Sequence, residues 1–138
     1  MTLTDAGPLV ALIDADEEDH ELCRTVLAQL ELPLVTTWPA FTEAMCLLGR
    51  SPSPAGREAM WRLVLSGRLE LVDLSPAAVE RTAKLMNTYA DVPMDLADAT
   101  LVALAEERGL RRVFSLDSDF RIYRLHARQH FDVLPGWR

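Results

Sequence analysis

The chain has 138 residues, a formal net charge of −7, 49% hydrophobic residues and 25% charged residues. These values indicate one globular domain over residues 1–138, and they exclude extended disorder and a protein that coats nucleic acid through bulk positive charge. The two cysteines are too few for a disulfide framework, and neither a signal peptide nor an apolar run of roughly 20 residues is found, so we expect a reduced, cytoplasmic protein with no membrane segment.

The first half of the chain alternates strands with helices. A strand covers residues 2–5 and ends in Asp5, and a short helix opens near Pro8, since proline is favoured in a first helical turn. Hydrophobic period and turn residues then predict a helix over 18–30, a strand over 32–37 and helices over 39–49 and 56–67. Cys46 lies in an apolar stretch of the helix predicted over 39–49, and we expect it in the core.

The second half continues the alternation. It predicts a strand over 69–75, helices over 76–90 and 95–109, a strand over 111–116 and a short last strand over 131–135. Such alternation is typical of an α/β fold with a central parallel sheet flanked by helices on both faces.

Acidic residues follow several of these strands. Asp5 and Asp117 stand at the carboxyl ends of two predicted strands, and parallel strands bring these ends to one edge, where sites of α/β proteins form. Glu43 lies in the first turns of the helix after strand 32–37, and Asp95 and Asp98 share a face where helix 95–109 begins. Carboxylates from four segments can therefore meet at this edge.

Each acid also has an ordinary explanation. Acids in a first helical turn complement the helix dipole, and Asp119 can serve as the N-cap of the segment FRIYR. As a group, however, clustered carboxylates repel one another unless a cation is present. Oxygen ligands without His or Cys favour Mg²⁺ or Mn²⁺, the ions of phosphoryl-transfer sites.

The basic residues are almost all arginine, and Lys84 is the one lysine. Six arginines lie between Arg108 and Arg128. Arginine recognises phosphate or carboxylate through its planar guanidinium, although an arginine-rich genome gives the same bias.

Four segments resemble PIN-domain ribonucleases of the VapC-like toxin type over nearly the whole chain: LTDAGPLVALID, TEA at 42–44, MDLADATLVALAEERG and VFSLDSDFRIYR. The resemblance implies a PIN-like α/β fold and an acidic, Mg²⁺-dependent site that cleaves RNA. It further implies a toxin that a cognate antitoxin neutralises, and a homodimer.

The resemblance also implies roles for particular residues. The four acids of the family, which act in catalysis, fall on Asp5, Glu43, Asp98 and Asp117. The metal ligands implied by the resemblance are Asp5, Asp98, Asp117 and the additional acid Asp119. These acids would hold one or two Mg²⁺ ions, or Mn²⁺ in their place. A water activated by the cation would then attack the phosphate. Ser115, where the family usually has Thr, and Asp95 support the site, and Arg121 and Arg124 contact RNA.

Two other classes stay open. One is a non-catalytic binding module whose acidic cleft docks a basic partner peptide. The other is a phospho-acceptor domain of response-regulator type, which needs a lysine beside the acids, whereas Lys84 lies in the middle of a predicted helix. A metal-dependent RNA cleavage assay separates the enzyme from the binding module, and retention of phosphate from acetyl phosphate identifies the phospho-acceptor.

Overall fold

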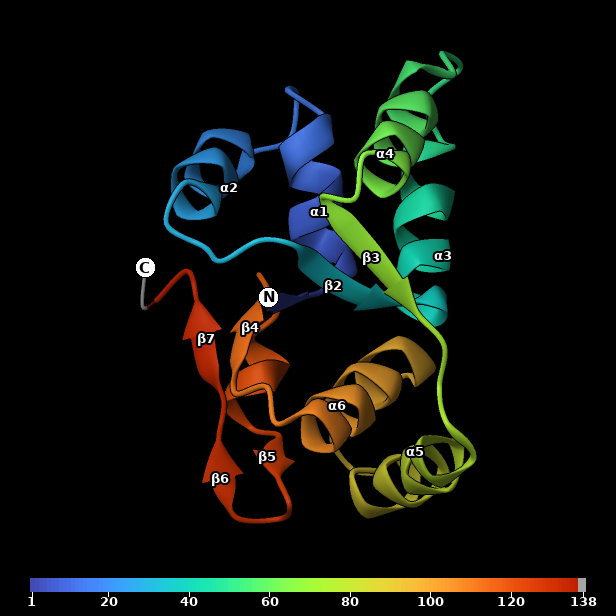
Figure 1. The fold of residues 1–138 in the computed structure, drawn as a ribbon, viewed down its shortest axis with the longest axis vertical. Coiled ribbons are helices and arrows are strands. Elements are labelled where there is room, and N and C mark those ends of the chain that lie inside the picture. The colour runs from blue at the N-terminus through green and yellow to red at the C-terminus, as the bar shows by residue number, and fades with distance from the viewer. Residues whose placement is uncertain (137–138) are drawn as a thin grey trace.

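The computed structural model describes residues 1–136 and is built around a parallel sheet with strand order β3-β2-β1-β4-β7 (Figure 1). The strands are β1 Thr2–Thr4, β2 Leu34–Thr37, β3 Leu69–Val72, β4 Arg112–Phe114 and β7 Asp132–Leu134. Every neighbouring pair in this sheet is parallel. The expected α/β fold with a central parallel sheet is therefore confirmed.

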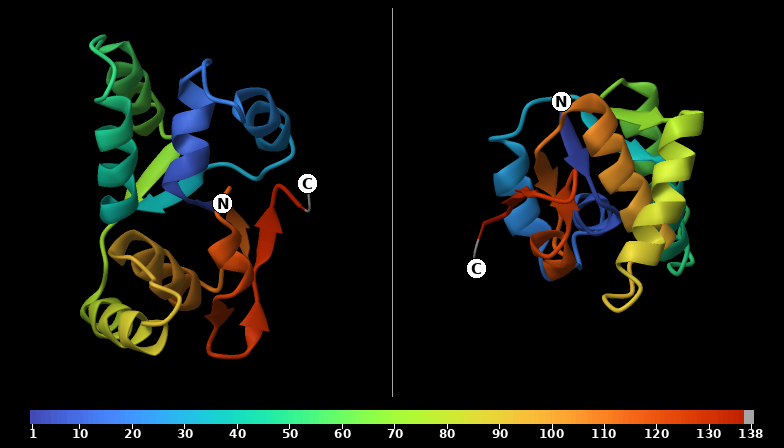
Figure 2. Two further views of the ribbon diagram at one scale, coloured as in Figure 1. Left: turned by 180° about the vertical axis from the view of Figure 1, so that it is seen from behind. Right: turned by 90° about the horizontal axis from the view of Figure 1, so that it is seen from below.

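Helices cover both faces of the sheet (Figures 1 and 2). One face packs under α1 Ala6–Ile13, α2 His20–Leu27, α3 Trp38–Leu48 and α4 Ala55–Leu65, and the other under α5 Pro76–Thr88 and α6 Leu96–Arg108. Alternation of strand side chains divides the core accordingly. Leu34 belongs to the hydrophobic cluster under α1 to α4, and its neighbour Val35 to the cluster under α5 and α6.

The region after β4 departs most from the sequence-based expectation. It forms the 3₁₀ helix η1 Ser118–Arg121 and an antiparallel hairpin of β5 Arg124–Leu125 and β6 Gln129–His130. The hairpin turns at His126 (φ 51°) and Ala127 (φ 62°). Hydrophobic periodicity does not predict a left-handed backbone at these two residues. No helix within residues 1–136 has the length and apolar character needed to cross a membrane.

The expectation that Cys46 lies in the core is wrong, because its side chain is exposed while Cys23 is the buried cysteine. The buried residues of α3 are Ala40, Phe41, Ala44 and Leu48. This spacing of three to four residues defines the inner face of the helix, and Cys46 falls on the opposite side.

Candidate functional site

Three carboxylates from distant parts of the chain meet at the carboxyl edge of the sheet. One potential ligand atom from each of Asp5, Asp98 and Asp117 lies within 4.8 Å of the others. Asp5 follows β1 and Asp117 follows β4, the strand paired with β1, while Asp98 comes from the first turn of α6. Parallel pairing of β1 with β4 brings the first two acids together, and α6 adds the third.

Helix capping fixes the backbone around these acids. Asp5 caps α1 and accepts a hydrogen bond from the Ala6 amide (2.7 Å), and Asp117 caps η1 and accepts from the Asp119 amide (2.9 Å). Asp95 caps α6 by accepting from the Asp98 amide (2.8 Å). The N-cap of the segment after β4 is therefore Asp117 and not Asp119.

Two hydroxyl groups hold the buried members of the cluster. The Ser115 hydroxyl donates to Oδ2 of Asp5 (3.0 Å) and accepts from the Asp117 amide (3.0 Å), so it links two of the three acids. The Tyr123 hydroxyl donates to Oδ2 of Asp98 (2.8 Å). Sequence reasoning missed Tyr123; its one signal was a tyrosine in an apolar segment, whose hydroxyl needs a partner when buried.

The electrostatics of the cluster disfavour three negative charges. Burial raises the pKa of Asp5 to about 6 against the hydrogen bonds from Ala6 and Ser115, which lower it. Burial, followed by the charge of Asp5, raises the pKa of Asp98 to about 8. A divalent cation would remove this penalty, and an all-oxygen donor set without His or Cys fits a hard cation. The residues present therefore fit a hard divalent cation.

Glu43 and Asp119 lie at the border of the cluster and outside the group of three. Glu43 is exposed on α3, and burial, then the charges of Asp95 and Asp117, raise its pKa. The pKa of Asp119 is raised by burial first and by Asp117 next. The negative charge of the neighbouring acids thus acts on both side chains. The catalytic role of Glu43 and the ligand role of Asp119 stay predictions.

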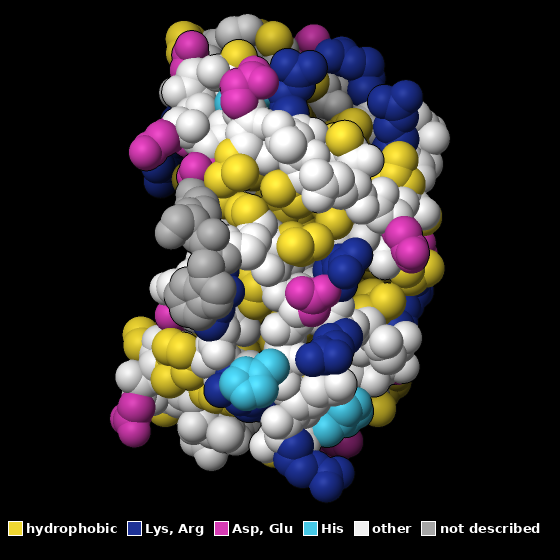
Figure 3. Space-filling model, turned by 90° about the vertical axis from the view of Figure 1, so that its left-hand side faces the viewer, with side chains coloured by type: hydrophobic (Ala, Val, Ile, Leu, Met, Phe, Trp, Pro, Cys, Tyr) yellow, Lys and Arg dark blue, Asp and Glu magenta, His cyan; other side chains and the backbone are white. Residues whose placement is uncertain are grey.

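The arginines of the C-terminal region are largely engaged in the fold. Arg108 pairs with Glu70 (3.5 Å), and Arg112 pairs with Asp132 (2.9 Å). Figure 3 shows arginine and histidine side chains gathered on the lower part of one face, at the height of the β5–β6 hairpin. The hairpin begins at Arg124, directly after Tyr123, and its second strand leads to the start of β7.

Of the two arginines predicted to contact RNA, Arg121 is the last residue of η1 and Arg124 is the first residue of β5. Nη1 of Arg124 donates to the carbonyl oxygens of Arg121 (2.8 Å), Ile122 (2.7 Å) and Tyr123 (3.0 Å). Nη2 of Arg121 donates to the carbonyl of Pro135 (3.4 Å). These hydrogen bonds hold both guanidinium groups against the backbone. Their contact with RNA stays a prediction.

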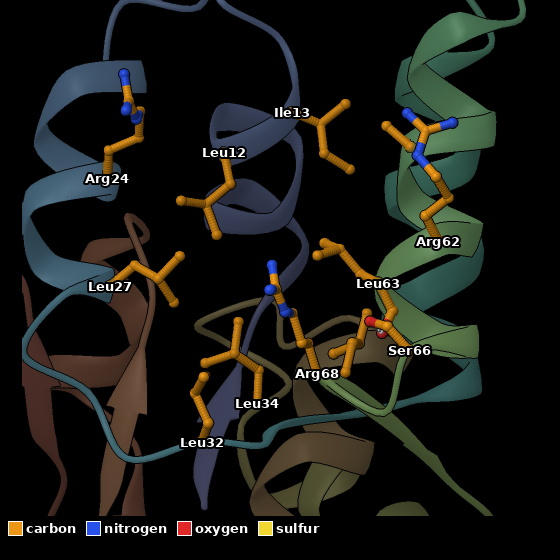
Figure 4. A pocket seen from close by; sticks show the side chains of 12 residues that line it. Leu12, Ile13, Arg24, Leu27, Leu32, Leu34, Arg62, Leu63, Ser66 and Arg68 are labelled. Carbon is orange, nitrogen blue, oxygen red and sulfur yellow. Dashed lines mark hydrogen bonds between the residues drawn. The ribbon is translucent and has the colours of Figure 1, made fainter.

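A separate hollow of about 650 Å³ lies between α1, α2 and α4 (Figure 4). Its lining is mainly aliphatic, and three guanidinium groups border it. No member of the acidic cluster lines it, so it is distinct from the candidate metal site. The lining includes Leu12, Ile13, Leu27, Leu32, Leu34 and Leu63 with Arg24, Arg62 and Arg68.

Comparison with known proteins supports the resemblance found in the sequence. The family model of the PIN domain matches residues 2–125. Ribonuclease VapC26 of Mycobacterium tuberculosis is 26% identical over 132 residues, which cover 96% of this chain and 90% of that protein.

Solved structures share the fold. One is the crystal structure of Mycobacterium tuberculosis VapC20, described as a Sarcin-Ricin loop cleaving toxin (TM-score 0.78, 18% identity, 86% of this chain and 92% of that chain). Another is a toxin–antitoxin complex from Klebsiella pneumoniae (TM-score 0.65, 20% identity, 87% of this chain and 90% of that chain).

Proposed function

The chain belongs to the PIN domain family, and we propose on that basis that it is a metal-dependent endoribonuclease, the toxin of a toxin–antitoxin pair. The observation that carries the proposal is the cluster of Asp5, Asp98 and Asp117, whose ligand atoms lie within 4.8 Å of one another. The relative named Ribonuclease VapC26, which aligns with nearly the whole chain, supports RNA as the substrate.

Asp5, Asp98 and Asp117 would hold a Mg²⁺ or Mn²⁺ ion, with Asp119 next to Asp117 as an additional ligand. When bound, such a cation lowers the pKa of water and offsets the charge of a phosphate group. Ser115 keeps Asp5 in place through the bond from its hydroxyl to Oδ2 (3.0 Å).

Asp95 and Glu43 complete the proposed set. Asp95 supports Asp98 by capping α6 with its side chain (2.8 Å). Glu43 belongs to the catalytic set because it extends from α3 into the field of Asp95 and Asp117 and is itself open to solvent. An exposed carboxylate of raised pKa can exchange a proton with water at the rim of the site.

Arg121 and Arg124 would contact the phosphate backbone of the RNA. Nη1 of Arg124 already donates to three carbonyl oxygens, whereas its Nε and Nη2 donate to none among residues 1–136. A guanidinium held by one nitrogen keeps its other donors in a fixed plane, which suits recognition of phosphate. With a net charge of −7, binding of RNA would depend on such local arginines and on the cation, because the chain as a whole repels phosphate.

Cleavage of RNA by the purified protein tests the catalytic proposal. We expect cleavage with Mg²⁺ or Mn²⁺, loss on adding EDTA, and recovery with excess Mg²⁺. Asp5→Asn should abolish cleavage. Asp73→Asn is the matched control, because Asp73 also follows a strand of the sheet, β3, but is exposed and outside the cluster. Full activity in EDTA, or in Asp5→Asn, contradicts the proposal.

The same preparations decide between the alternatives. A binding module would retain a basic peptide and leave RNA intact with every metal. A phospho-acceptor would retain phosphate from acetyl phosphate, although Lys84 is exposed in the middle of α5. In cells, we expect cytoplasmic expression without a partner to arrest growth, and Asp5→Ala to relieve the arrest at equal protein level.

The partners of the proposed toxin are a cognate antitoxin and a second copy of the chain. The toxin–antitoxin complex among the structural neighbours supports the first. The hollow of Figure 4 suits an amphipathic antitoxin segment, since its aliphatic lining can bury apolar side chains and Arg24, Arg62 and Arg68 can pair with acidic ones. Leu63→Glu should therefore abolish co-purification with the antitoxin and leave RNA cleavage intact. Retained co-purification excludes this surface.

A further inference from the structure

One short segment, residues 115–123, supports the whole acidic cluster. It supplies Asp117 itself and the Ser115 hydroxyl that holds Asp5. Its last residue, Tyr123, donates its hydroxyl to Oδ2 of Asp98 (2.8 Å). Thus each of the two buried acids is held by a hydroxyl from the segment that carries the third.

Packing fixes the direction of the Tyr123 hydroxyl. The Tyr123 side chain is fully buried, and its ring meets the rings of Tyr89 (5.2 Å, 72°) and Phe120 (5.3 Å, 81°) edge to face. Its backbone amide donates to the carbonyl of Asp119 (3.1 Å). A ring held from two sides can present its hydroxyl in one direction only, and that direction leads to Asp98.

We propose that Tyr123 is a positioning residue of the cation site: it holds Asp98 by Oδ2 and leaves Oδ1 to the cation. Oδ1 of Asp98 accepts no hydrogen bond among residues 1–136. A carboxylate that is already held loses less rotational freedom when it binds an ion, which is why hydrogen-bond partners of ligands raise metal affinity. The inference rests on the proposed function, because it requires that Asp98 bind a cation.

The chain offers a matched control for this hydroxyl. Tyr89 and Tyr123 are its two tyrosines, and their rings touch in the same aromatic group. The Tyr89 hydroxyl, however, accepts from the Arg124 amide (3.0 Å) and does not contact Asp98. Replacing either tyrosine with phenylalanine removes one hydroxyl from the same aromatic group, that of Tyr89 being half-buried, and only the change at Tyr123 removes a hydrogen bond to the acids.

The decisive measurement is Mn²⁺ affinity without RNA, by calorimetry, in the parent, Tyr123→Phe and Tyr89→Phe. Tyr123→Phe should bind about tenfold more weakly, and Tyr89→Phe within about twofold of the parent. In RNA cleavage, the metal concentration giving half-maximal rate should rise by a similar factor for Tyr123→Phe, while the rate at saturating metal changes less. A folded Tyr123→Phe with the affinity of the parent overturns the inference.

A second measurement needs no substitution of Tyr123. Protein labelled with 3-fluorotyrosine gives two ¹⁹F resonances, and the labelled Tyr89→Phe variant gives that of Tyr123 alone. Saturating Mg²⁺ should shift this resonance, because the acceptor of its hydrogen bond binds the ion. No shift, in protein that calorimetry shows to be loaded, overturns the inference. A parent that binds neither ion overturns the proposed function as well, whereas normal binding by Tyr123→Phe overturns this inference alone.

Discussion

Helix α6 carries two carboxylates in opposite electrostatic situations. At its start, Asp98 is buried beside Asp5 with one hydrogen bond from Tyr123, and its pKa is raised to about 8. Near its end, the Glu106 side chain is 6% exposed and accepts two hydrogen bonds from Arg81 (2.7 and 3.1 Å) and one from the His126 amide. Burial alone would raise the pKa of Glu106, but these bonds lower it.

The difference shows what the acidic edge lacks. Where this chain buries a carboxylate for stability, it supplies a guanidinium from α5. No arginine or lysine within residues 1–136 forms an ion pair with Asp5, Asp98 or Asp117. Residues 1–136 therefore supply no cationic partner for these acids, and their three converging oxygen atoms suit the divalent cation proposed above.

The largest contrast is expected in catalysis. Asp98→Asn should lower the rate of RNA cleavage by at least about 100-fold, because a cation that stabilises the transition state contributes several kcal/mol. Glu106→Gln should keep the rate within a few fold of the parent, since Glu106 is at the other end of α6. Equal losses in the two variants, measured at matched folded concentration, would remove the contrast.

Without metal, Asp98 and Glu106 should affect the pH dependence of folding stability in opposite directions. The raised pKa of Asp98 means that the folded protein retains a proton which the unfolded chain releases above about pH 4. Stability should then fall as pH rises toward 8, by at most about 1.4 kcal/mol per pH unit for one proton.

Urea unfolding in EDTA at pH 5 and pH 8 measures this dependence. Asp98→Asn should be more stable than the parent at pH 8, the difference in stability should be much smaller at pH 5, and it should vanish below about pH 4. The lowered pKa of Glu106 acts in the opposite sense: its contribution is present above pH 4.5 and is lost as pH falls through the lowered value. If Asp98→Asn is less stable than the parent at pH 8, the ionised Asp98 carboxylate does not destabilise the metal-free protein, and this prediction is wrong.

Removal of the Glu106 charge should cost folding free energy. Glu106→Gln weakens both bonds from Arg81, and charge-assisted hydrogen bonds contribute about 1.5–3 kcal/mol. Since Arg81 is one-third exposed, we expect the lower end of that range at pH 7. Glu80→Gln, at an exposed position of α5, is the control and should change stability by less than about 0.5 kcal/mol. If Glu106→Gln and Glu80→Gln lose the same unfolding free energy, Glu106 does not have the stabilising role inferred here.

The smallest effect concerns the cap of α6. Asp95→Ala removes the acceptor for the Asp98 amide and should cost about 1 kcal/mol, whereas Asp95→Asn should be nearly neutral because asparagine caps as well as aspartate. Both variants are compared by urea unfolding in EDTA. A large loss in Asp95→Asn would show that Asp95 acts through its charge.

Much of this arrangement is predictable because it depends on local rules. Asp5 and Asp117 end apolar segments, and parallel pairing of β1 with β4 then places them at one edge. Asp98 follows from its place in the first turn of a helix whose ends are marked in the sequence by Asp95 and Gly109. The strand predicted over 111–116 is shorter in the structure, Arg112–Phe114, because the chain turns into η1 to bring Asp117 to the site.

The remaining features depend on contacts between segments remote in sequence. The bond from Tyr123 to Asp98 and the bonds from Arg81 to Glu106 join residues 25 positions apart, and no period or motif encodes either. Cys46 was misplaced because an apolar stretch does not reveal which side of its helix faces the core.

The central claim is that a cation completes the acidic edge, and thermal unfolding with and without Mn²⁺ tests it most directly. A ligand that binds only the folded protein stabilises it by about 2.7 kcal/mol at a hundredfold excess over Kd. The parent should therefore melt at a higher temperature with Mn²⁺, Asp98→Asn should show little increase, and Asp73→Asn should behave as the parent. An Asp98→Asn variant that keeps both the full Mn²⁺-induced increase and RNA cleavage would contradict the account.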